Sequence, residues 1–369
     1  MSEFIFKAMR FKITCLFALL IVWCNNSYAQ TPKIVYQDAS KFHLYGKAFH
    51  TPQPYHRVDT ARYSDLPIAV KRLLTHSAGL AVVFKTNSKT ISAKWCVTNS
   101  KALNNLTPIA QKGLDLYIKK DGKWQFAGVG RPTDICSEFT LVKAMDNAEK
   151  ECMLFLPLYD ELKSLAIGID EGSNIVALAN PFKKRIVIYG SSIVHGASAG
   201  RPGMAYPAIL SRNTGLYFMN IGISGNAKME KAAAKMISDI EADAFVLDCV
   251  PNPSPKQIKE RTEDFVKTIR ANHTKAPIIL IQSIFREQGN FDLDVRERVN
   301  QQNEEITAAF NRLRNAGVKD LYLITSEKLL GDDHDASTDG IHPNDLGFYR
   351  MAEGLAPQLT QIFNQYQIK

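Results

Sequence analysis

The pattern of hydrophobic and polar positions changes near residue 180. Between residues 30 and 179, short runs alternate apolar and polar side chains, as at 79–86, 90–96 and 114–118. Turn residues such as those of the Lys-Asp-Gly-Lys segment at 120–123 separate these runs. A period of two with regularly spaced turns is typical of an antiparallel sandwich. We therefore expect an all-β domain over residues 30–180.

From residue 185 onward, apolar β-rich runs alternate with helical patterns. The predicted strands cover residues 185–189, 216–220, 244–248, 277–282 and 320–324. The predicted helices cover residues 205–213, 227–240, 255–272, 295–316 and about 346–366. Strands without strict alternation, each followed by a helix, predict a parallel sheet that is buried on both faces. Residues 181–369 are therefore expected to form an α/β domain, in which ligands bind beyond the carboxyl ends of the strands.

The first 29 residues have the pattern of a signal peptide. Lys7, Arg10 and Lys12 precede an apolar run over residues 13–24, and small side chains precede a predicted cleavage after Ala29. The apolar run is short for a membrane span, so an uncleaved anchor is the weaker alternative. We expect the mature chain to be exported to the periplasm or the cell exterior, with no stable membrane insertion after cleavage.

Composition and charge narrow the class of protein. The 369 residues are 45% hydrophobic and 22% charged, which is typical of a globular chain with room for two domains. The formal net charge is +8, of which the predicted leader contributes a net +2. The basic residues are scattered and form no dense run, so binding of nucleic acid is not expected.

Four cysteines lie outside the predicted leader: Cys96, Cys136, Cys152 and Cys249. An exported protein can pair some of them. Their spacing contains no CxxC motif, so zinc is not indicated, and we expect neither a metal nor an organic cofactor. Cys249 lies in an apolar strand and is interpreted as a buried free thiol. Any disulfide would join two of the other three, and the sequence leaves the pairing open.

Four short polar segments lie at or after the ends of predicted strands. They are Gly-Ser-Ser-Ile at 190–193, Asn-Ile-Gly-Ile-Ser-Gly-Asn at 220–226, Asp-Cys-Val-Pro-Asn at 248–252, and Asp-Gly-Ile-His-Pro at 339–343. Each pattern is weak alone. Together they supply a nucleophile, donors for an oxyanion and an acid–base pair, at the edge of the sheet where ligands bind.

The nucleophile and its base are predicted to be Ser192 and His342. A serine hydroxyl is a poor nucleophile unless a base takes its proton, and a neutral imidazole is suited to that task. Asp339, three residues before His342, can bond the other ring nitrogen and fix its tautomer. The structural alternatives are that Ser192 caps a turn or helix and that Asp339 caps a helix beside a surface histidine. Ser191 is the second choice for the nucleophile.

The predicted oxyanion donors are the backbone N–H groups of Ser192 and Gly225 and the side chain of Asn252. Such donors stabilise the negative charge of a tetrahedral intermediate. Gly225 and Asn252 are equally compatible with ordinary turns. Two further residues are candidates for substrate binding. Arg201 follows the nucleophile loop and is either a substrate ligand or a solvated arginine, and His195 is a pocket wall or a satisfied histidine.

With these residues in place, the second half resembles the SGNH (GDSL-type) hydrolases from about residue 185 to the C-terminus. Members of that family are serine esterases with a flavodoxin-like three-layer α/β/α fold. Their four blocks carry serine, glycine, asparagine and histidine in the order of Ser192, Gly225, Asn252 and His342. One departure is Ser191, where the family has the aspartate of Gly-Asp-Ser-Leu.

The first half is similar to the jelly-roll-like β-sandwich that precedes such hydrolases in some exported Bacteroidetes-type proteins. The resemblance rests on the Gly-Leu-Asp-Leu-Tyr stretch at 113–117, a GxDLY motif. Two-domain relatives with a leading sandwich include carbohydrate esterases that remove acetyl groups from plant polysaccharides.

The resemblance and the residues together imply an exported serine esterase that removes acetyl or other short acyl groups from a carbohydrate or a small molecule. Three alternatives remain open: a lipase-like or lysophospholipase-like acylhydrolase, an acyltransferase, and a catalytically inert glycan-binding protein. The oligomeric state is left open.

Overall fold

The computed structural model describes residues 33–98 and 101–369. The predicted signal peptide at 1–29 lies outside the described residues, and its cleavage stays a prediction. Among the described residues, no helix combines the length with the apolar character that a membrane span requires.

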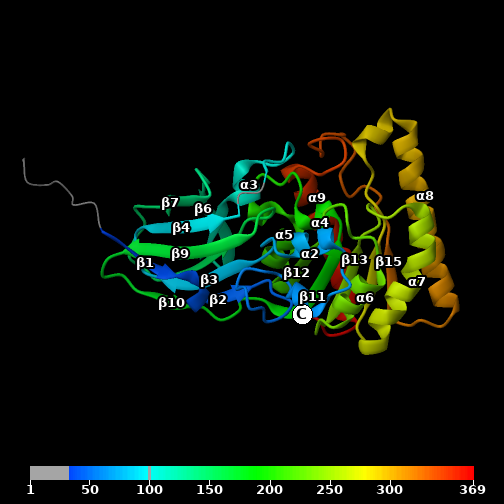
Figure 1. Ribbon diagram of the computed structural model, residues 1–369, viewed down its shortest axis with the longest axis horizontal. Coiled ribbons are helices and arrows are strands. Elements are labelled where there is room, and N and C mark those ends of the chain that lie inside the picture. The colour runs from blue at the N-terminus through cyan, green and yellow to red at the C-terminus, as the bar shows by residue number, and fades with distance from the viewer. Residues whose placement is uncertain (1–32, 99–100) are drawn as a thin grey trace, which may run out of the picture. The chain divides into compact units, whose positions relative to one another are not determined.

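Two antiparallel sheets form the first half of the described chain (Figure 1). One sheet has the strand order β1-β9-β4-β7, and the other has the order β10-β3-β8-β5-β6 with β2 paired to β3. The strands are β1 (Ile34–Asp38), β2 (His43–Tyr45), β3 (Ala81–Thr86), β4 (Ile91–Val97), β5 (Leu114–Lys120), β6 (Lys123–Gly130), β7 (Cys136–Val142), β8 (Lys150–Phe155), β9 (Leu162–Asp170) and β10 (Ile175–Ala177). Phe84, Trp95, Leu154 and Ile167 belong to one buried core between the sheets. The predicted sandwich is confirmed.

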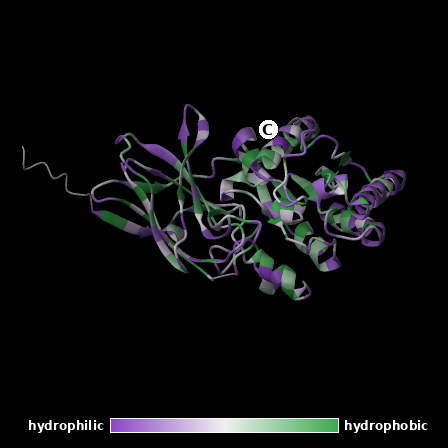
Figure 2. Ribbon diagram, turned by 90° about the horizontal axis from the view of Figure 1, so that it is seen from above, coloured by the Kyte–Doolittle hydropathy of each residue, from purple (hydrophilic) through white to green (hydrophobic). Residues whose placement is uncertain are grey.

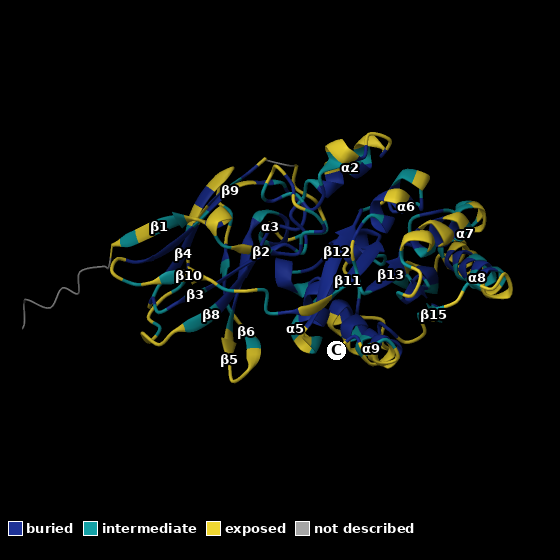
Figure 3. Cartoon of the chain, turned by 90° about the horizontal axis from the view of Figure 1, so that it is seen from below, coloured by how far each residue is buried: buried dark blue, intermediate teal, exposed yellow. Residues whose placement is uncertain are grey.

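The second half contains one parallel sheet with the order β12-β11-β13-β14-β15. Its strands are β11 (Lys183–Gly190), β12 (Leu216–Gly222), β13 (Ala244–Asp248), β14 (Ile278–Ile281) and β15 (Leu321–Ile324). Counted within this half, the order is 2-1-3-4-5, which is the flavodoxin-like order. All residues of β12 and β13 are buried, as expected for strands covered on both faces (Figure 3).

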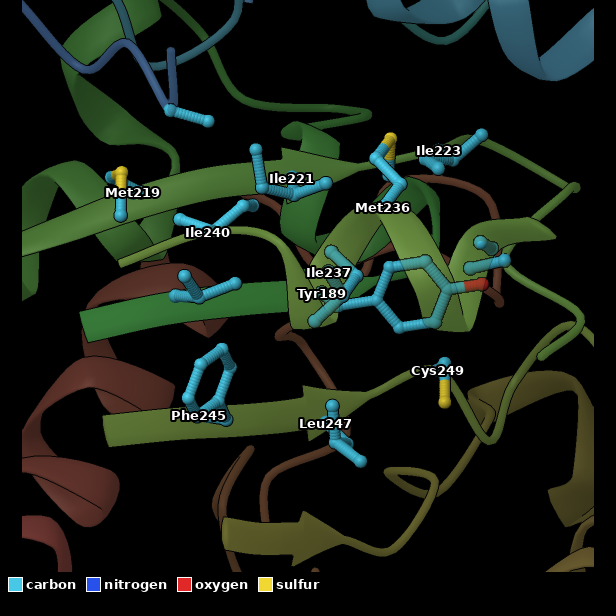
Figure 4. Close-up of a cluster of buried hydrophobic side chains, with 14 of the residues drawn as sticks. Tyr189, Met219, Ile221, Ile223, Met236, Ile237, Ile240, Phe245, Leu247 and Cys249 are labelled. Carbon is cyan, nitrogen blue, oxygen red and sulfur yellow. The ribbon is translucent and has the colours of Figure 1, made fainter. Parts of the chain in front are cut away.

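Helices cover both faces of the parallel sheet. They are α4 (Ser192–His195), α5 (Tyr206–Thr214), α6 (Lys231–Ser238), α7 (Pro255–Asn272), α8 (Leu293–Asn315) and α9 (Asp345–Asn364). Alternate residues of β11 belong to different cores. Val187 and Tyr189 share a core with residues of α6, α7 and α8, including Met236 and Ile237 (Figure 4). Ile186 and Ile188 share the other core with residues of α5 and α9. The result is the three-layer arrangement that the sequence predicts.

The outer helices have one apolar face and several polar faces, which explains why their periodicity is visible in the sequence. Helix α7 buries Ile258, Phe265, Val266 and Ile269, which recur at helical spacing, while its other faces are mostly polar. Figure 2 shows the same division, with green apolar strands inside and purple faces on the surface helices. Ser254 caps α7 in a capping box, so the start of the helix is encoded locally.

The two halves share a hydrophobic core. One side of β3 contributes Val82 and Phe84 to the sandwich core. The opposite side contributes Ala81 and Val83 to the core that also contains Val187 of the parallel sheet. Residues Val35–Lys369 accordingly form one compact unit. The change of architecture near residue 180 therefore does not separate two independent cores.

Of the four cysteines outside the predicted leader, two form a disulfide and two are free thiols. Cys96 of β4 and Cys136 of β7 form a disulfide between neighbouring strands. Cys152 and Cys249 are buried and free. The prediction for Cys249 is confirmed, and the pairing that the sequence left open is Cys96 with Cys136.

Candidate active site

The nucleophile candidate Ser192 begins the short helix α4 directly after β11. Gly190 makes this turn possible, because a Cβ there would lie 2.2 Å from Val194 Cγ2 and 2.3 Å from the Asp248 carbonyl oxygen. Ser191 is fully buried, and its Oγ accepts a hydrogen bond from the Ile193 N–H at 3.2 Å. Ser191 thus caps α4, while Ser192 retains 8% of its surface exposed.

A hydrogen-bonded chain joins Ser192 to His342 and Asp339. Ser192 Oγ lies 2.8 Å from His342 Nε2. His342 Nδ1 lies 2.8 Å from Asp339 Oδ2. A carboxylate only accepts hydrogen bonds, so Nδ1 carries the ring proton and the lone pair of Nε2 faces the serine hydroxyl. The three residues that sequence reasoning grouped are therefore brought together in the order that proton transfer needs.

Hydrogen bonds from backbone N–H groups to the Asp339 side chain hold the loop that carries Asp339 and His342. Asp339 Oδ1 accepts the N–H groups of Ile341 at 3.0 Å and His342 at 2.8 Å. Gly340 adopts a φ of 81°, a left-handed conformation that favours glycine. Partial burial acts to raise the pKa of Asp339, but the backbone and ring N–H groups of His342 outweigh it and lower the pKa below its ordinary value. The carboxylate therefore stays ionised beside the imidazole.

The loops with the predicted oxyanion donors are tied to the nucleophile loop. Ile223 donates its N–H to the Gly190 carbonyl at 2.8 Å, and Ser191 donates to the Asp248 carbonyl at 3.1 Å. Gly225 has a φ of 69°, and, apart from its two chain neighbours, no described residue has an atom within 4 Å of the Cβ position that it leaves open. Asn252 Oδ1 accepts the Ala227 N–H at 3.1 Å, which orients the side-chain amide. All four polar segments are thus connected at one edge of the sheet.

Arg201, a predicted substrate ligand, is bound instead by the GxDLY segment of the first half. Its Nη1 donates to Asp115 Oδ2 at 2.7 Å and to the Tyr117 hydroxyl at 2.5 Å. Asp115 is fully buried and also accepts the Gly203 N–H at 2.8 Å. Burial raises the pKa of Asp115, an effect that Arg201 opposes. The expectation for Arg201 is therefore corrected: its guanidinium pairs a buried carboxylate between the two halves.

Tyr117, the last residue of the motif, completes this contact. The Arg212 guanidinium lies 4.1 Å from the centre of the Tyr117 ring, a cation–π distance. A Cβ on Gly203 would lie 2.6 Å from the same ring. The polar residues of the GxDLY segment thus hold the 201–203 loop that follows the nucleophile helix.

His195, the other predicted substrate ligand, has no exposed surface. Its Nε2 lies 2.7 Å from the Leu158 carbonyl oxygen, and its ring stacks on Tyr159 at 4.1 Å between centroids. Burial is the main cause that lowers its pKa well below the ordinary value. The neutral ring is therefore enclosed in the interior, with Nε2 hydrogen-bonded and Nδ1 without a hydrogen-bond partner among the described residues.

Sequence reasoning missed Asn105, which the first half contributes to this site. Its Nδ2 lies 3.1 Å from Asp339 Oδ2 and 3.3 Å from His342 Nδ1. Thr107 anchors the same loop by donating to the Gly200 carbonyl at 2.7 Å. Nothing in the local sequence distinguishes Asn105 from its neighbour Asn104. Its contact with Asp339 spans 234 positions of sequence and follows only from the fold.

A second buried cation lies behind the oxyanion loop. Arg57 is fully buried, and its Nη1 donates to the carbonyls of Asn220 at 3.0 Å and Gly222 at 2.9 Å, at the end of β12. Its other nitrogens donate to the carbonyls of Leu73 and His76. Backbone carbonyl groups of both halves thus satisfy the guanidinium, and Arg57 holds the strand that leads to Gly225.

Asp248 lies buried beneath the nucleophile loop. Tyr206 donates its hydroxyl to Asp248 Oδ2 at 2.7 Å. Burial raises the pKa of Asp248 to about 7, although the Tyr206 hydrogen bond acts in the opposite direction. Between an ordinary carboxyl pKa and about 7, the folded protein holds a proton that the unfolded chain has released.

Stability should therefore fall as the pH rises from about 4 to about 7, and Asp248→Asn should remove this dependence. The buried neutral acid is favourable below this window, and this contribution is lost as the carboxylate forms. Urea unfolding at pH 5 and pH 8 measures the effect. Relative to wild type, the variant should gain stability at pH 8 by up to about 4 kcal/mol. Identical pH profiles for the two proteins would contradict the assignment.

A polar pocket adjoins the turn that contains Gly225. Its volume is about 510 Å³, and its lining includes Ser224 and Asn226 of that turn together with Gln111 and Tyr159 of the first half. The Tyr159 hydroxyl also lies 3.4 Å from the Ser192 carbonyl oxygen. A larger cavity of about 600 Å³ lies against β4, β7 and β9 and shares no residue with the four polar segments.

Acidic residues near the last segment do not gather into a metal site. His334 Nδ1 lies 2.9 Å from Glu287 Oε2, and Arg350 pairs with Asp333 at 2.7 Å. Within residues 33–98 and 101–369, no group of three or more His, Cys, Asp or Glu side chains is placed to hold a metal ion.

Comparison with known proteins finds two family matches, one in each half of the chain. The GDSL-like lipase/acylhydrolase family matches residues 183–360. The GxDLY family, described as the N-terminus of SGNH-hydro-type esterases, matches residues 34–175. No curated protein matches the chain.

Three solved structures illustrate the similarity. A GDSL-like lipase candidate from Bacteroides ovatus is 55% identical, with a TM-score of 0.89 over 90% of this chain and 98% of that one. A salicylyl-acyltransferase from a tetracycline biosynthetic pathway is 19% identical, with a TM-score of 0.69 over 90% and 98%. An acetyl xylan esterase from the rumen bacterium Butyrivibrio proteoclasticus is 13% identical, with a TM-score of 0.57 over 90% of this chain and 99% of that one.

The last two similarities concern the fold alone. The similarity to the Bacteroides protein extends over both halves and accompanies the two family matches. The chain therefore belongs to the GDSL-like lipase/acylhydrolase family of SGNH hydrolases, and it is an enzyme of the esterase/acylhydrolase class.

Proposed function

We propose that this protein is an exported serine esterase that removes acetyl or other short acyl groups from carbohydrates through an acyl-enzyme. The observation that carries the proposal is the unbroken chain from Ser192 Oγ through His342 to Asp339, with both links at 2.8 Å. The nearest alternatives are a lipase-type or lysophospholipase-type acylhydrolase and an inert glycan-binding protein.

In the proposed mechanism, Ser192 Oγ attacks the acyl carbon while His342 Nε2 takes its proton. The tetrahedral intermediate carries its negative charge on the former carbonyl oxygen. The N–H groups of Ser192 and Gly225 and the amide of Asn252 are the proposed donors to that oxygen, and losing one such donor costs about 10²–10³-fold in kcat. His342 then protonates the departing alcohol, and water activated by His342 releases the acid and restores Ser192.

Two features support export of the chain to an oxidising compartment. The first is the leader pattern at residues 1–29. The second is the disulfide between Cys96 and Cys136, because disulfides persist mainly in exported proteins. The acetyl xylan esterase among the structural neighbours is consistent with a sugar ester as substrate, but its similarity to this chain concerns the fold alone.

Asn105 is proposed to position the Asp339–His342 pair. Replacing Asn105 with alanine should lower kcat for a small acetate ester by about tenfold, because a hydrogen bond to a charged carboxylate is lost. The KM should change little, since the side chain acts through Asp339 rather than on the substrate. Asn104→Ala is the matched control, because Asn104 is an exposed neighbour in the same loop. Equal kcat values for the two variants would remove Asn105 from the proposed site.

The experiment that tests the proposed function is hydrolysis of para-nitrophenyl acetate, butyrate and octanoate, followed by release of acetate from acetylated xylan. Acetate should be the preferred acyl group, and acetylated xylan should be deacetylated. A preference for octanoate would support the lipase-type alternative. A folded protein that neither hydrolyses these esters nor reacts with a serine-directed fluorophosphonate would support the glycan-binding alternative.

A further inference from the structure

The polar pocket described above lies against the machinery proposed for ester cleavage, and the inference drawn from it rests on the proposed function. Ser224 and Asn226 line the pocket on either side of Gly225, a proposed oxyanion donor. Tyr159 lines it as well and contacts the backbone of Ser192. The pocket therefore borders the turn that carries a proposed oxyanion donor.

The size of the pocket indicates which part of an ester it would hold. Its volume of about 510 Å³ is in the range of small-molecule sites and far exceeds an acetyl group. With a short acyl group, the larger part of the substrate is the alcohol. The lining includes the polar residues Thr75, Ser224 and Asn226, which suit a hydroxyl-rich alcohol such as a sugar.

The charges in the lining are unbalanced. Glu161 is the acidic residue of the lining, and its carboxylate is already bound to Lys163 at 2.6 Å and His56 at 2.8 Å. Arg72 and Lys101 also line the pocket, are exposed, and form no ion pair with any residue from the described parts of the chain. Within the described residues, Arg72 and Lys101 thus lack an ion-pair partner, whereas the Glu161 carboxylate is already paired.

His76, another residue of the lining, experiences the same field. Its pKa is lowered to about 4, chiefly by burial and then by the positive charge of Arg57. The Asp160 carboxylate acts in the opposite direction, and Arg72 makes a smaller contribution that lowers the pKa. The imidazole is therefore neutral at physiological pH and adds no charge of its own. Arg72 and Lys101 supply the exposed positive charge of the pocket, and the buried Arg57 and Asp160, which carry opposite charges, both act on His76.

We propose that this pocket binds the sugar part of the substrate and selects a sugar that carries an anionic group, either a carboxylate or a sulfate. Arg72 and Lys101 pair with that group while the polar side chains bind hydroxyls. Binding of the sugar, which is the alcohol part of the ester, thereby positions the ester bond at Ser192. The first half of the chain supplies most of the residues that recognise the sugar.

The test uses three matched substrates: methyl glucoside, methyl glucuronoside and methyl glucoside 6-sulfate, each acetylated on the same secondary hydroxyl. At low salt, kcat/KM for an anionic sugar should exceed that for the neutral one by about tenfold, and added salt should reduce the preference. The glucuronoside and the sulfate separate the two sources of charge, and a preference for either supports the proposal.

The variant Arg72→Gln/Lys101→Gln should abolish this preference, measured as the ratio of kcat/KM for the anionic sugar to kcat/KM for the neutral one. Lys275→Gln/Arg314→Gln is the matched control, because it removes the same charge from exposed positions outside the pocket. The pocket assignment is overturned if wild type shows no preference for an anionic sugar, or if the pocket variant keeps it.

A binding measurement separates this proposal from the proposed function. Calorimetric titration of wild-type protein with methyl glucuronoside, methyl glucoside 6-sulfate and methyl glucoside requires no ester cleavage. Binding of an anionic glycoside that disappears in the pocket variant, in a protein without esterase activity, would support the pocket and contradict the esterase. Esterase activity with equal binding of all three glycosides would do the reverse.

Discussion

Replacing Ser192 with alanine removes esterase activity, with kcat expected to fall by about a million-fold. The hydroxyl that lies 2.8 Å from His342 Nε2 is lost, and no other serine takes its place. Ser191 is adjacent but fully buried, and its Oγ is engaged as the cap of α4. Hydrolysis of para-nitrophenyl acetate measures the effect, and unfolding curves establish that the variant is folded.

Ser191→Ala is the control for this prediction. It should keep most of the activity and lose about 1 kcal/mol of stability through loss of the helix cap. A fluorophosphonate should label a peptide of wild type at Ser192, and this label should persist in Ser191→Ala. Activity that survives in Ser192→Ala and disappears in Ser191→Ala would move the nucleophile by one residue and overturn the proposed geometry.

Asp339→Asn should lower kcat by about 10⁴-fold with little change in the fold. The asparagine oxygen can still accept the N–H groups of Ile341 and His342, so the loop keeps its shape. Its amide then faces His342 Nδ1 as a donor. The imidazole must carry its proton on Nε2 instead, where it cannot accept the proton of Ser192.

The tautomer is testable directly. Nitrogen NMR of the histidine ring should show the proton on Nδ1 in wild type and on Nε2 in Asp339→Asn. Asp335→Asn provides a control for the change of charge, because Asp335 is an exposed carboxylate in the preceding loop. If Asp339→Asn kept wild-type kcat, Asp339 would have no role in orienting His342.

The strands of the second half were predictable because their physical signals are local. A parallel strand covered on both faces is apolar at most positions. The predicted strand at 244–248, which is apolar up to its last residue Asp248, coincides with β13 to the residue. Helix α7 was equally clear, since its capping box and its apolar spacing both lie within 20 residues of sequence. Helices α2 (Ile68–Leu74) and α3 (Pro108–Lys112) are too short to show a periodic pattern, and they were missed.

The residues that join the two halves were beyond the reach of sequence patterns. The aspartate and tyrosine of the GxDLY stretch carried a family resemblance, but their partner Arg201 lies 86 positions from Asp115. Nothing in the sequence around Arg57 distinguishes it from a surface arginine. Only the fold shows that it is buried and that backbone carbonyl groups surround its guanidinium. For His195, the sequence left two interpretations open, a pocket wall and a satisfied histidine, because only its proximity to Ser192 was visible. The fold shows that its ring points inward and stacks on Tyr159.

The buried pair of Asp115 and Arg201 limits how this protein can be re-engineered. Grafting a foreign sandwich onto residues 183–369 would strand a half-buried arginine without its carboxylate, and a donor sandwich lacking Arg57 and Asn105 would leave the loops around Ser192 unsupported. Modular exchange at residue 180 would therefore yield defective chimeras. Directed evolution of new substrate preference has to mutate both halves together, with the 101–107 loop treated as part of the hydrolase.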